Sequence, residues 1–171
     1  MKYLSKISLV VLLLYFFNCH SLPYEVNKED SGNKIVTGEF PKSVLQLDPD
    51  MNSWYAMNYA GYSVDTASLS AIDSLFGGSH VVIIMGTWCG DSKHQIPHLI
   101  KIFDEAKIDS TQYEIHGVDR AMKSPDRFGE KYGVKFVPTI VFTKEGKEIG
   151  RIVEMPTETL EKDIVKILEK H

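Results

Sequence analysis

The stretch Met85–Leu99, MGTWCGDSKHQIPHL, joins an apolar run to a helical pattern. The run, Val81–Met85, is apolar throughout and begins with β-branched residues, which is typical of a strand buried on both faces. From Cys89 to about Lys107 the apolar residues recur at helical spacing. The stretch therefore predicts a strand that passes directly into a helix, with Cys89 at the N-terminus of that helix.

A cysteine at this position has favourable conditions for nucleophilic chemistry. The unpaired N–H groups and the positive end of the helix dipole favour an anion, and the thiolate is the nucleophilic form of cysteine. Ser92 lies one turn further on, where its hydroxyl can donate to the sulfur, whereas the nearby anion Asp91 opposes thiolate formation. We therefore predict Cys89 and Ser92 as catalytic residues, and the alternative is an inert buried cysteine.

Further elements follow on both sides of this junction. The other predicted strands are an edge strand near 34–38 and strands at 113–118, 139–142 and 148–153. The other predicted helices are at 66–76, from Ser124 to about Gly133 with Ser124 as its cap, and from Pro156 onward. Helices that alternate with buried strands and end in a hairpin indicate an α/β sandwich with a mixed sheet.

The segment Asp48–Tyr62 is rich in aromatic residues, and two interpretations stay open. The aromatic residues are Trp54, Tyr55, Tyr59 and Tyr62. They form either a turn or helix that packs on the domain or an aromatic patch that faces a substrate. Packing is the favoured interpretation, because large aromatic side chains are mostly packing residues.

Several short motifs resemble the thioredoxin superfamily. They are Trp88-Cys89-Gly90 at a strand–helix junction, Pro97 eight residues after the cysteine, the segment Tyr132–Thr139 (YGVKFVPT), and the glycines Gly146 and Gly150. The resemblance covers about residues 65–170. It implies a thioredoxin-like three-layer sandwich over residues 63–171, with a cis peptide bond before Pro138 that faces Cys89.

The resemblance also implies a function and a binding surface. It implies a thiol–disulfide oxidoreductase-like protein without a cofactor, whose partners are protein or small-molecule thiols and disulfides. The implied substrate-binding residues are Trp88, Gly90, Asp91, Val137, Pro138 and Thr139.

Two positions depart from the family pattern. Ser92 stands where dithiol members have a second cysteine, and Ile83 stands where many have a buried acid. A second cysteine normally resolves the mixed disulfide, so this chain is expected to form mixed disulfides through Cys89 alone. The alternative is a redox-inactive binding module that uses the Cys89/Pro138 face.

The N-terminus has the pattern of an export signal. Lys2 and Lys6 precede the apolar run Ile7–Phe17, which is short for a membrane span. The expected signal peptide is residues 1–21, or residues 1–18 with lipidation at Cys19, followed by an extension over residues 22–62. A membrane-anchor helix is the rival interpretation. With WCGDS, this pattern is similar to that of exported bacterial thioredoxin-like proteins and predicts the periplasm or cell envelope, with membrane contact only through a lipid anchor.

Composition and residue spacing exclude other classes of function. The net charge is −4 and the chain has no basic run, so nucleic acid is not an expected partner. His94 and His98 have metal-ligand spacing, but they fall on the side of the helix opposite Cys89 and are expected to face solvent. His80 and His116 have no identifiable partner. The sequence therefore predicts no metal site.

Overall fold

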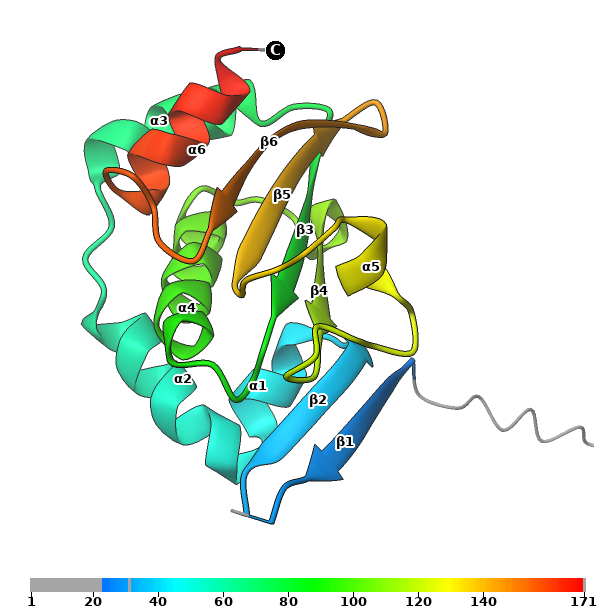
Figure 1. Ribbon diagram of the computed structural model, residues 1–171. Helices are drawn as coiled ribbons and strands as arrows, with labels where there is room; N and C mark the ends of the chain where they lie inside the picture. Colours follow the sequence, from blue (N-terminus) through cyan, green and yellow to red (C-terminus); the bar gives the residue numbers. More distant parts are fainter. Residues whose placement is uncertain (1–22, 31, 171) are drawn as a thin grey trace, which may run out of the picture.

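A computed structural model describes residues 23–30 and 32–170 of the 171-residue chain (Figure 1). The predicted signal peptide and Cys19 lie outside these residues. Among the described residues, the helices are all too short or too polar to cross a membrane.

A mixed six-stranded sheet forms the centre of the fold. The strand order is β1-β2-β4-β3-β5-β6, with β3 and β4 parallel and all other neighbours antiparallel. The strands are β1 (Tyr24–Lys28), β2 (Lys34–Glu39), β3 (Ser79–Met85), β4 (Tyr113–Gly117), β5 (Thr139–Lys144) and β6 (Lys147–Val153). The predicted α/β fold with a mixed central sheet is confirmed.

Helices cover both faces of this sheet (Figure 1). The helices are α1 (Lys42–Leu47), α2 (Pro49–Gly61), α3 (Thr66–Leu75), α4 (Gly90–Glu105), α5 (Phe128–Lys131) and α6 (Leu160–Leu168). The main core lies between the sheet and five of these helices, and a smaller core lies under α5 and its flanking loops. Val81 and Ile83 of β3 face the first core, and Val82 and Ile84 face the second. This arrangement explains why β3 is an unbroken apolar run.

The N-terminal extension contains more structure than the sequence indicates. The strand predicted near 34–38 exists, but it lies inside the sheet between β1 and β4 and is not an edge strand. The edge strand on this side of the sheet is β1, which the sequence does not predict. Four of its five residues are exposed, and its alternation of apolar and polar residues covers only four positions, which is too short to identify a strand.

Two predicted helix starts are wrong, and side-chain hydrogen bonds explain both differences. Instead of capping a helix, the Ser124 hydroxyl donates to Asp126, and the chain turns through Arg127 at φ 60° before α5 begins. The last helix begins at Leu160 rather than near Pro156. The Asp163 carboxylate accepts the backbone N–H groups of residues 157 and 158 and holds them in a turn, and the Thr159 side chain caps α6.

The aromatic segment packs onto the fold, as the favoured interpretation predicts. Tyr55 is buried, and Trp54, Tyr59 and Tyr62 pack against the main core. The Tyr59 hydroxyl donates to Asp104 on α4, and the Tyr62 hydroxyl donates to the side chain of Glu161 on α6. These contacts attach α2 to the helices that cover the main core.

Candidate functional site

Cys89 lies at the point where the chain leaves β3 and enters α4. It is the N-cap residue of α4 and is half-buried. Its backbone N–H donates to the Gly86 carbonyl at 2.9 Å, and its own carbonyl accepts from Lys93 at 3.0 Å. Its side chain makes no capping hydrogen bond to the N–H groups of the first turn. This geometry places the thiol where the helix dipole favours an anion.

The thiol meets the segment before β5. The Cys89 Sγ donates to the Val137 carbonyl oxygen at 3.1 Å, and the peptide bond between Val137 and Pro138 is cis, as the resemblance implies. Thr139 begins β5, and its hydroxyl donates to the Phe136 carbonyl at 2.7 Å. The fold therefore brings together Cys89 and the predicted binding segment, which are separated by almost fifty residues of sequence.

Ser92 lies beneath the site and is completely buried. Its Oγ accepts the backbone N–H of Gly86 at 3.2 Å, which fixes the loop that leads from β3 to Cys89. In the part of the chain that the structure describes, no hydrogen bond joins Ser92 to the sulfur of Cys89. A hydrogen bond from the Ser92 hydroxyl to the thiolate therefore stays a prediction.

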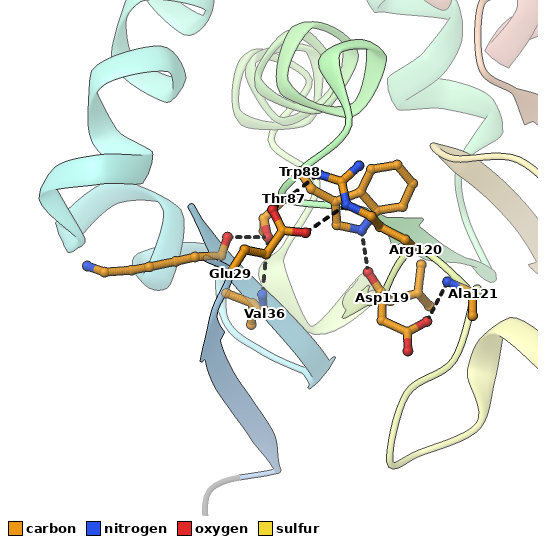
Figure 2. Close-up of polar contacts among 9 residues, drawn as sticks. Glu29, Val36, Thr87, Trp88, Asp119, Arg120 and Ala121 are labelled. Carbon is orange, nitrogen blue, oxygen red and sulfur yellow. Dashed lines mark hydrogen bonds and ion pairs between the residues drawn. The ribbon is translucent and has the colours of Figure 1, made fainter. Parts of the chain in front are cut away.

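Trp88 forms one wall of the site and is fixed by a specific contact. Its indole Nε1 donates to the Val118 carbonyl at 2.9 Å (Figure 2). Gly86 lies so close to this ring that an added Cβ would be 2.6 Å from a ring carbon. A glycine at this position is therefore needed for the observed orientation of Trp88.

A cation that sequence reasoning missed lies on Trp88. The Arg120 guanidinium is 4.8 Å from the centre of the ring, and its Nε donates to Glu29 at 2.7 Å (Figure 2). The hydrogen bonds to Glu29 raise the pKa of Arg120 above its ordinary value, and the attraction of a Cys89 thiolate acts in the same direction. Arg120 therefore adds a positive charge beside the thiol, and no motif in the sequence connects these two residues.

The β1–β2 hairpin also holds the loop that precedes Cys89. The Thr87 hydroxyl accepts the backbone N–H of Val36 and donates to the Lys34 carbonyl, each at 3.1 Å (Figure 2). The Thr87 side chain thus continues the hydrogen-bonding pattern of β2 beyond the sheet. As a result, residues of the N-terminal extension hold both Thr87, which precedes Trp88, and Arg120, which lies over its ring.

The rim of the site includes exposed apolar side chains. Phe136 is 54% exposed and Met155 is 55% exposed. Phe136 directly precedes Val137, and Glu154, the neighbour of Met155, donates its backbone N–H to the Pro138 carbonyl at 2.7 Å. Gly90 and Asp91 are exposed at the start of α4. This rim can take an apolar segment of a partner protein next to the thiol.

The histidines of α4 do not form a metal site with Cys89, but one of them is not where it was expected. His94 is exposed, whereas His98 is buried with its ring stacked on Tyr62 at a centroid distance of 4.1 Å. The expectation that His98 faces solvent is wrong, because the segment between α2 and α3 covers this side of α4. Burial and the neighbouring His94 lower the pKa of His98 to about 4.

His116 also has partners that the sequence did not indicate. It is buried, and its Nδ1 lies 2.7 Å from the Asp126 carboxylate. Among the described residues, a single group of at least three His, Cys, Asp or Glu side chains has the spacing to hold a metal ion, and it consists of Glu39, Glu114 and His116.

Comparisons with known proteins agree with this geometry. The sequence pattern of a family described as "Thioredoxin" matches residues 39–166. A thioredoxin from Chlamydia trachomatis is 29% identical over 100 residues, which are 58% of this chain and 88% of that protein. Thioredoxin H9 from Arabidopsis thaliana is 29% identical over 83 residues, which are 48% of this chain and 55% of that protein.

Two solved structures resemble the fold. A protein of unknown function from Pseudomonas aeruginosa has a TM-score of 0.55 at 14% identity, covering 75% of this chain and 90% of that chain. An HIV epitope-scaffold has a TM-score of 0.57 at 14% identity, covering 78% of this chain and 93% of that chain. At this identity the likeness concerns the fold alone. The family match covers most of the chain and includes both segments that meet at Cys89, and on this evidence the protein belongs to the thioredoxin family.

Proposed function

We propose that this protein carries out thiol–disulfide exchange through Cys89 alone and forms mixed disulfides with protein or small-molecule partners. The observation that carries the proposal is the position of the Cys89 sulfur, at the N-terminus of α4 and 3.1 Å from the carbonyl that precedes the cis-proline. The positive end of the α4 dipole and the Arg120 guanidinium both lie on the side of the site that holds this sulfur, and the thiolate is the reactive form of cysteine.

The first chemical step is an exchange in which one S–S bond breaks and another forms. The Cys89 thiolate attacks one sulfur of a partner disulfide, and the other sulfur leaves as a thiolate that takes a proton from water. The product is a mixed disulfide between Cys89 and the partner. Phe136 and Met155 supply an exposed apolar surface for the partner beside the reacting sulfur.

The second step needs a thiol from outside the protein. Ser92 occupies the position one turn after Cys89. Disulfide exchange requires attack by a thiolate, so the Ser92 hydroxyl cannot resolve the mixed disulfide. An external thiolate must therefore attack the mixed disulfide, which releases Cys89 as a thiolate and leaves the partner in a new disulfide. The predicted consequence is a mixed disulfide that persists until such a thiol is added.

The experiment is to treat the purified protein with oxidised glutathione and measure its intact mass. We expect one glutathione adduct on Cys89 that is stable after the reagent is removed, and no adduct at this position in Cys89→Ser. Ser92→Cys is the matched variant, and it should release the glutathione by forming an internal disulfide. Catalytic reduction of a protein disulfide by the unaltered chain without an added thiol would contradict the single-cysteine mechanism.

A second function rests on the exposed rim of the site. Phe136 and Met155 lie beside Pro138, and a surface of this kind can bind a protein segment without any redox step. Cys89→Ser separates the two functions, because it abolishes mixed-disulfide formation but leaves non-covalent binding to this face intact.

We also propose that the protein is exported to the periplasm or cell envelope. The support is the sequence pattern of Lys2, Lys6 and the apolar run that follows. The intact mass of the protein from its native host tests this. Loss of residues 1–21 indicates soluble export, loss of residues 1–18 with a lipid on Cys19 indicates a lipoprotein, and a chain that retains Met1 contradicts the proposal.

A further inference from the structure

His116 lies on the opposite side of the sheet from the main core and has one ring nitrogen with no hydrogen-bond partner. The side chain is 0% exposed, and its ring stacks on Phe128 at a centroid distance of 3.6 Å. Its Nδ1 is hydrogen-bonded to Asp126, whereas Nε2 is buried and forms no hydrogen bond. Buried polar atoms are nearly always satisfied, so this nitrogen requires an explanation.

Two carboxylates converge on the same nitrogen. Glu114 is two residues before His116 on β4 and therefore lies on the same face of the sheet, and its Oε2 is 3.5 Å from Nε2. Glu39 is directly opposite His116 in the antiparallel pairing of β2 and β4. One ligand atom from each of the three residues lies within 4.8 Å of the other two. The sheet register thus gathers one imidazole and two carboxylates at one point.

The remaining contact of His116 matches the environment of a metal-bound histidine. A histidine that binds a metal usually donates its other ring N–H to a carboxylate, which fixes the tautomer and orients the ring. Asp126 provides this carboxylate at 2.7 Å from Nδ1, and the Ser124 hydroxyl donates to Asp126 in turn. With the proton on Nδ1, the lone pair of Nε2 points toward the two glutamates.

The distances are compatible with a bound ion. Ligand atoms about 2.1 Å from a tetrahedral ion are roughly 3.4 Å apart, and the observed separation between Nε2 and the Glu114 oxygen is 3.5 Å. Glu39 is exposed, so its side chain can move to close the remaining distance. Glu39 is exposed and Glu114 is half-buried, so an ion can reach both carboxylates from solvent.

We propose that Glu39, Glu114 and the Nε2 of His116 bind one divalent transition-metal ion, with water completing the coordination and Asp126 orienting the histidine. Imidazole and carboxylate ligands together suit Zn²⁺ and neighbouring divalent ions. The site is separate from Cys89 and does not depend on the proposed redox function. Its structural effect follows from its position, because β2 and β4 pair through two residue pairs only, and the ion would connect these strands.

A proton competes with the ion for the same nitrogen. Burial lowers the pKa of His116, but the contacts with Glu114 and Asp126 outweigh burial and hold it above its ordinary value. Glu114 and Asp126 face the ring from β4 and from the loop before α5, and Glu39 faces it from β2. An experiment must therefore detect the ion itself rather than a change in charge.

The test uses the full chain with Cys19→Ser and Cys89→Ser, so that thiols do not bind the ion. Titration calorimetry with Zn²⁺ should give one ion per chain, and nitrogen NMR should show that Nε2 of His116 is the bound atom. Glu39→Gln and Glu114→Gln should each weaken binding at least tenfold, and Asp126→Asn should weaken it roughly 10- to 100-fold, as other second-sphere changes do. His94→Ala, which removes an exposed histidine elsewhere, should leave the affinity unchanged.

Each outcome decides the proposal. Substitutions of the buried His116 can prevent folding. Glu39 is exposed, so Glu39→Gln is expected to fold and tests the site without disturbing the core. An increase in the melting temperature with Zn²⁺ that disappears in Glu39→Gln supports the site. Absence of binding, or binding that is unaffected by both Glu39→Gln and Glu114→Gln, overturns it.

Discussion

Arg120 lies with its guanidinium 4.8 Å from the centre of the Trp88 ring. The two residues come from different parts of the chain, since Trp88 precedes α4 and Arg120 follows β4. Asp119 accepts the backbone N–H of Ala121 (Figure 2) and that of residue 123, and so holds the loop that presents Arg120. Glu29 from the N-terminal hairpin fixes the guanidinium from the other side. The environment of Cys89 therefore depends on three segments that are distant in sequence.

Removal of this charge should slow the reaction of Cys89 with an alkylating agent. We expect Arg120→Met to lower the alkylation rate at pH 7 roughly twofold to fivefold, because an exposed charge interaction is weak. The effect should shrink at high salt, which screens exposed charges. Arg127→Met is the control, since Arg127 is exposed and forms an ion pair with Glu130 at the start of α5. Equal rates for Arg120→Met and the unaltered chain would contradict a role for Arg120.

Substitution of Gly86 should disturb the wall of the site. In Gly86→Ala the new Cβ would be 2.6 Å from the Trp88 ring, so the ring must move. We expect a loss of about 1–3 kcal/mol in the free energy of unfolding, as for other overpacked sites, and a change in tryptophan fluorescence. In Gly77→Ala no atom lies within 4 Å of the new Cβ, and the stability should change by less than about 0.5 kcal/mol. If the two variants are equally stable in urea denaturation, the close approach of Gly86 to the Trp88 ring does not require a glycine.

The structural role of Ser92 can be separated from its chemical role. Ser92→Ala leaves the buried N–H of Gly86 without its acceptor, and we expect a loss of about 1–3 kcal/mol in the free energy of unfolding. Ser74→Ala is the control, because the exposed Ser74 hydroxyl donates only to the Ser70 carbonyl of its own helix. If Ser92→Ala is as stable as Ser74→Ala, the hydrogen bond to Gly86 does not contribute to stability. A slower alkylation of Cys89 in Ser92→Ala would separately support donation to the thiolate.

The stability of the fold should fall in acid through His98. Its pKa lies near 4 in the folded protein and at the ordinary value of 6.5 in the unfolded chain, so the unfolded chain binds more protons between these values. Above pH 6.5 the His98 ring is neutral in both the folded and the unfolded chain, so it does not reduce the free energy of unfolding. As the pH falls from 6.5 toward 4, the unfolded chain takes up the proton first, and the free energy of unfolding decreases. The lowered pKa corresponds to at most about 3 kcal/mol.

The measurement is urea denaturation of the protein at pH 4.5 and at pH 7. His98→Phe keeps a ring against Tyr62 but cannot take up a proton, so its stability should decrease less between these conditions than that of the unaltered chain. The same decrease in both proteins would mean that other groups cause the acid sensitivity.

The amino-acid sequence by itself determined the central part of the fold. The apolar run of β3, the spacing of apolar residues along α4 and the hairpin of β5 and β6 were recognisable because each element carries its own periodic pattern. The position of Cys89 at the start of α4 followed from the same patterns. The cis bond before Pro138 followed from the resemblance, which depends on several short motifs in order.

Only the tertiary structure decided which residues surround the thiol and which nitrogen atoms are buried. Strand β1 and helix α1 carry few buried residues, so no periodic pattern identified them. Contacts such as Glu29 with Arg120 and Asp126 with His116 join residues from different elements, and spacing along the chain contains no record of them. His98 illustrates the reason: its place on α4 is set by helical geometry, but its burial is set by Tyr62, which comes from the segment between α2 and α3.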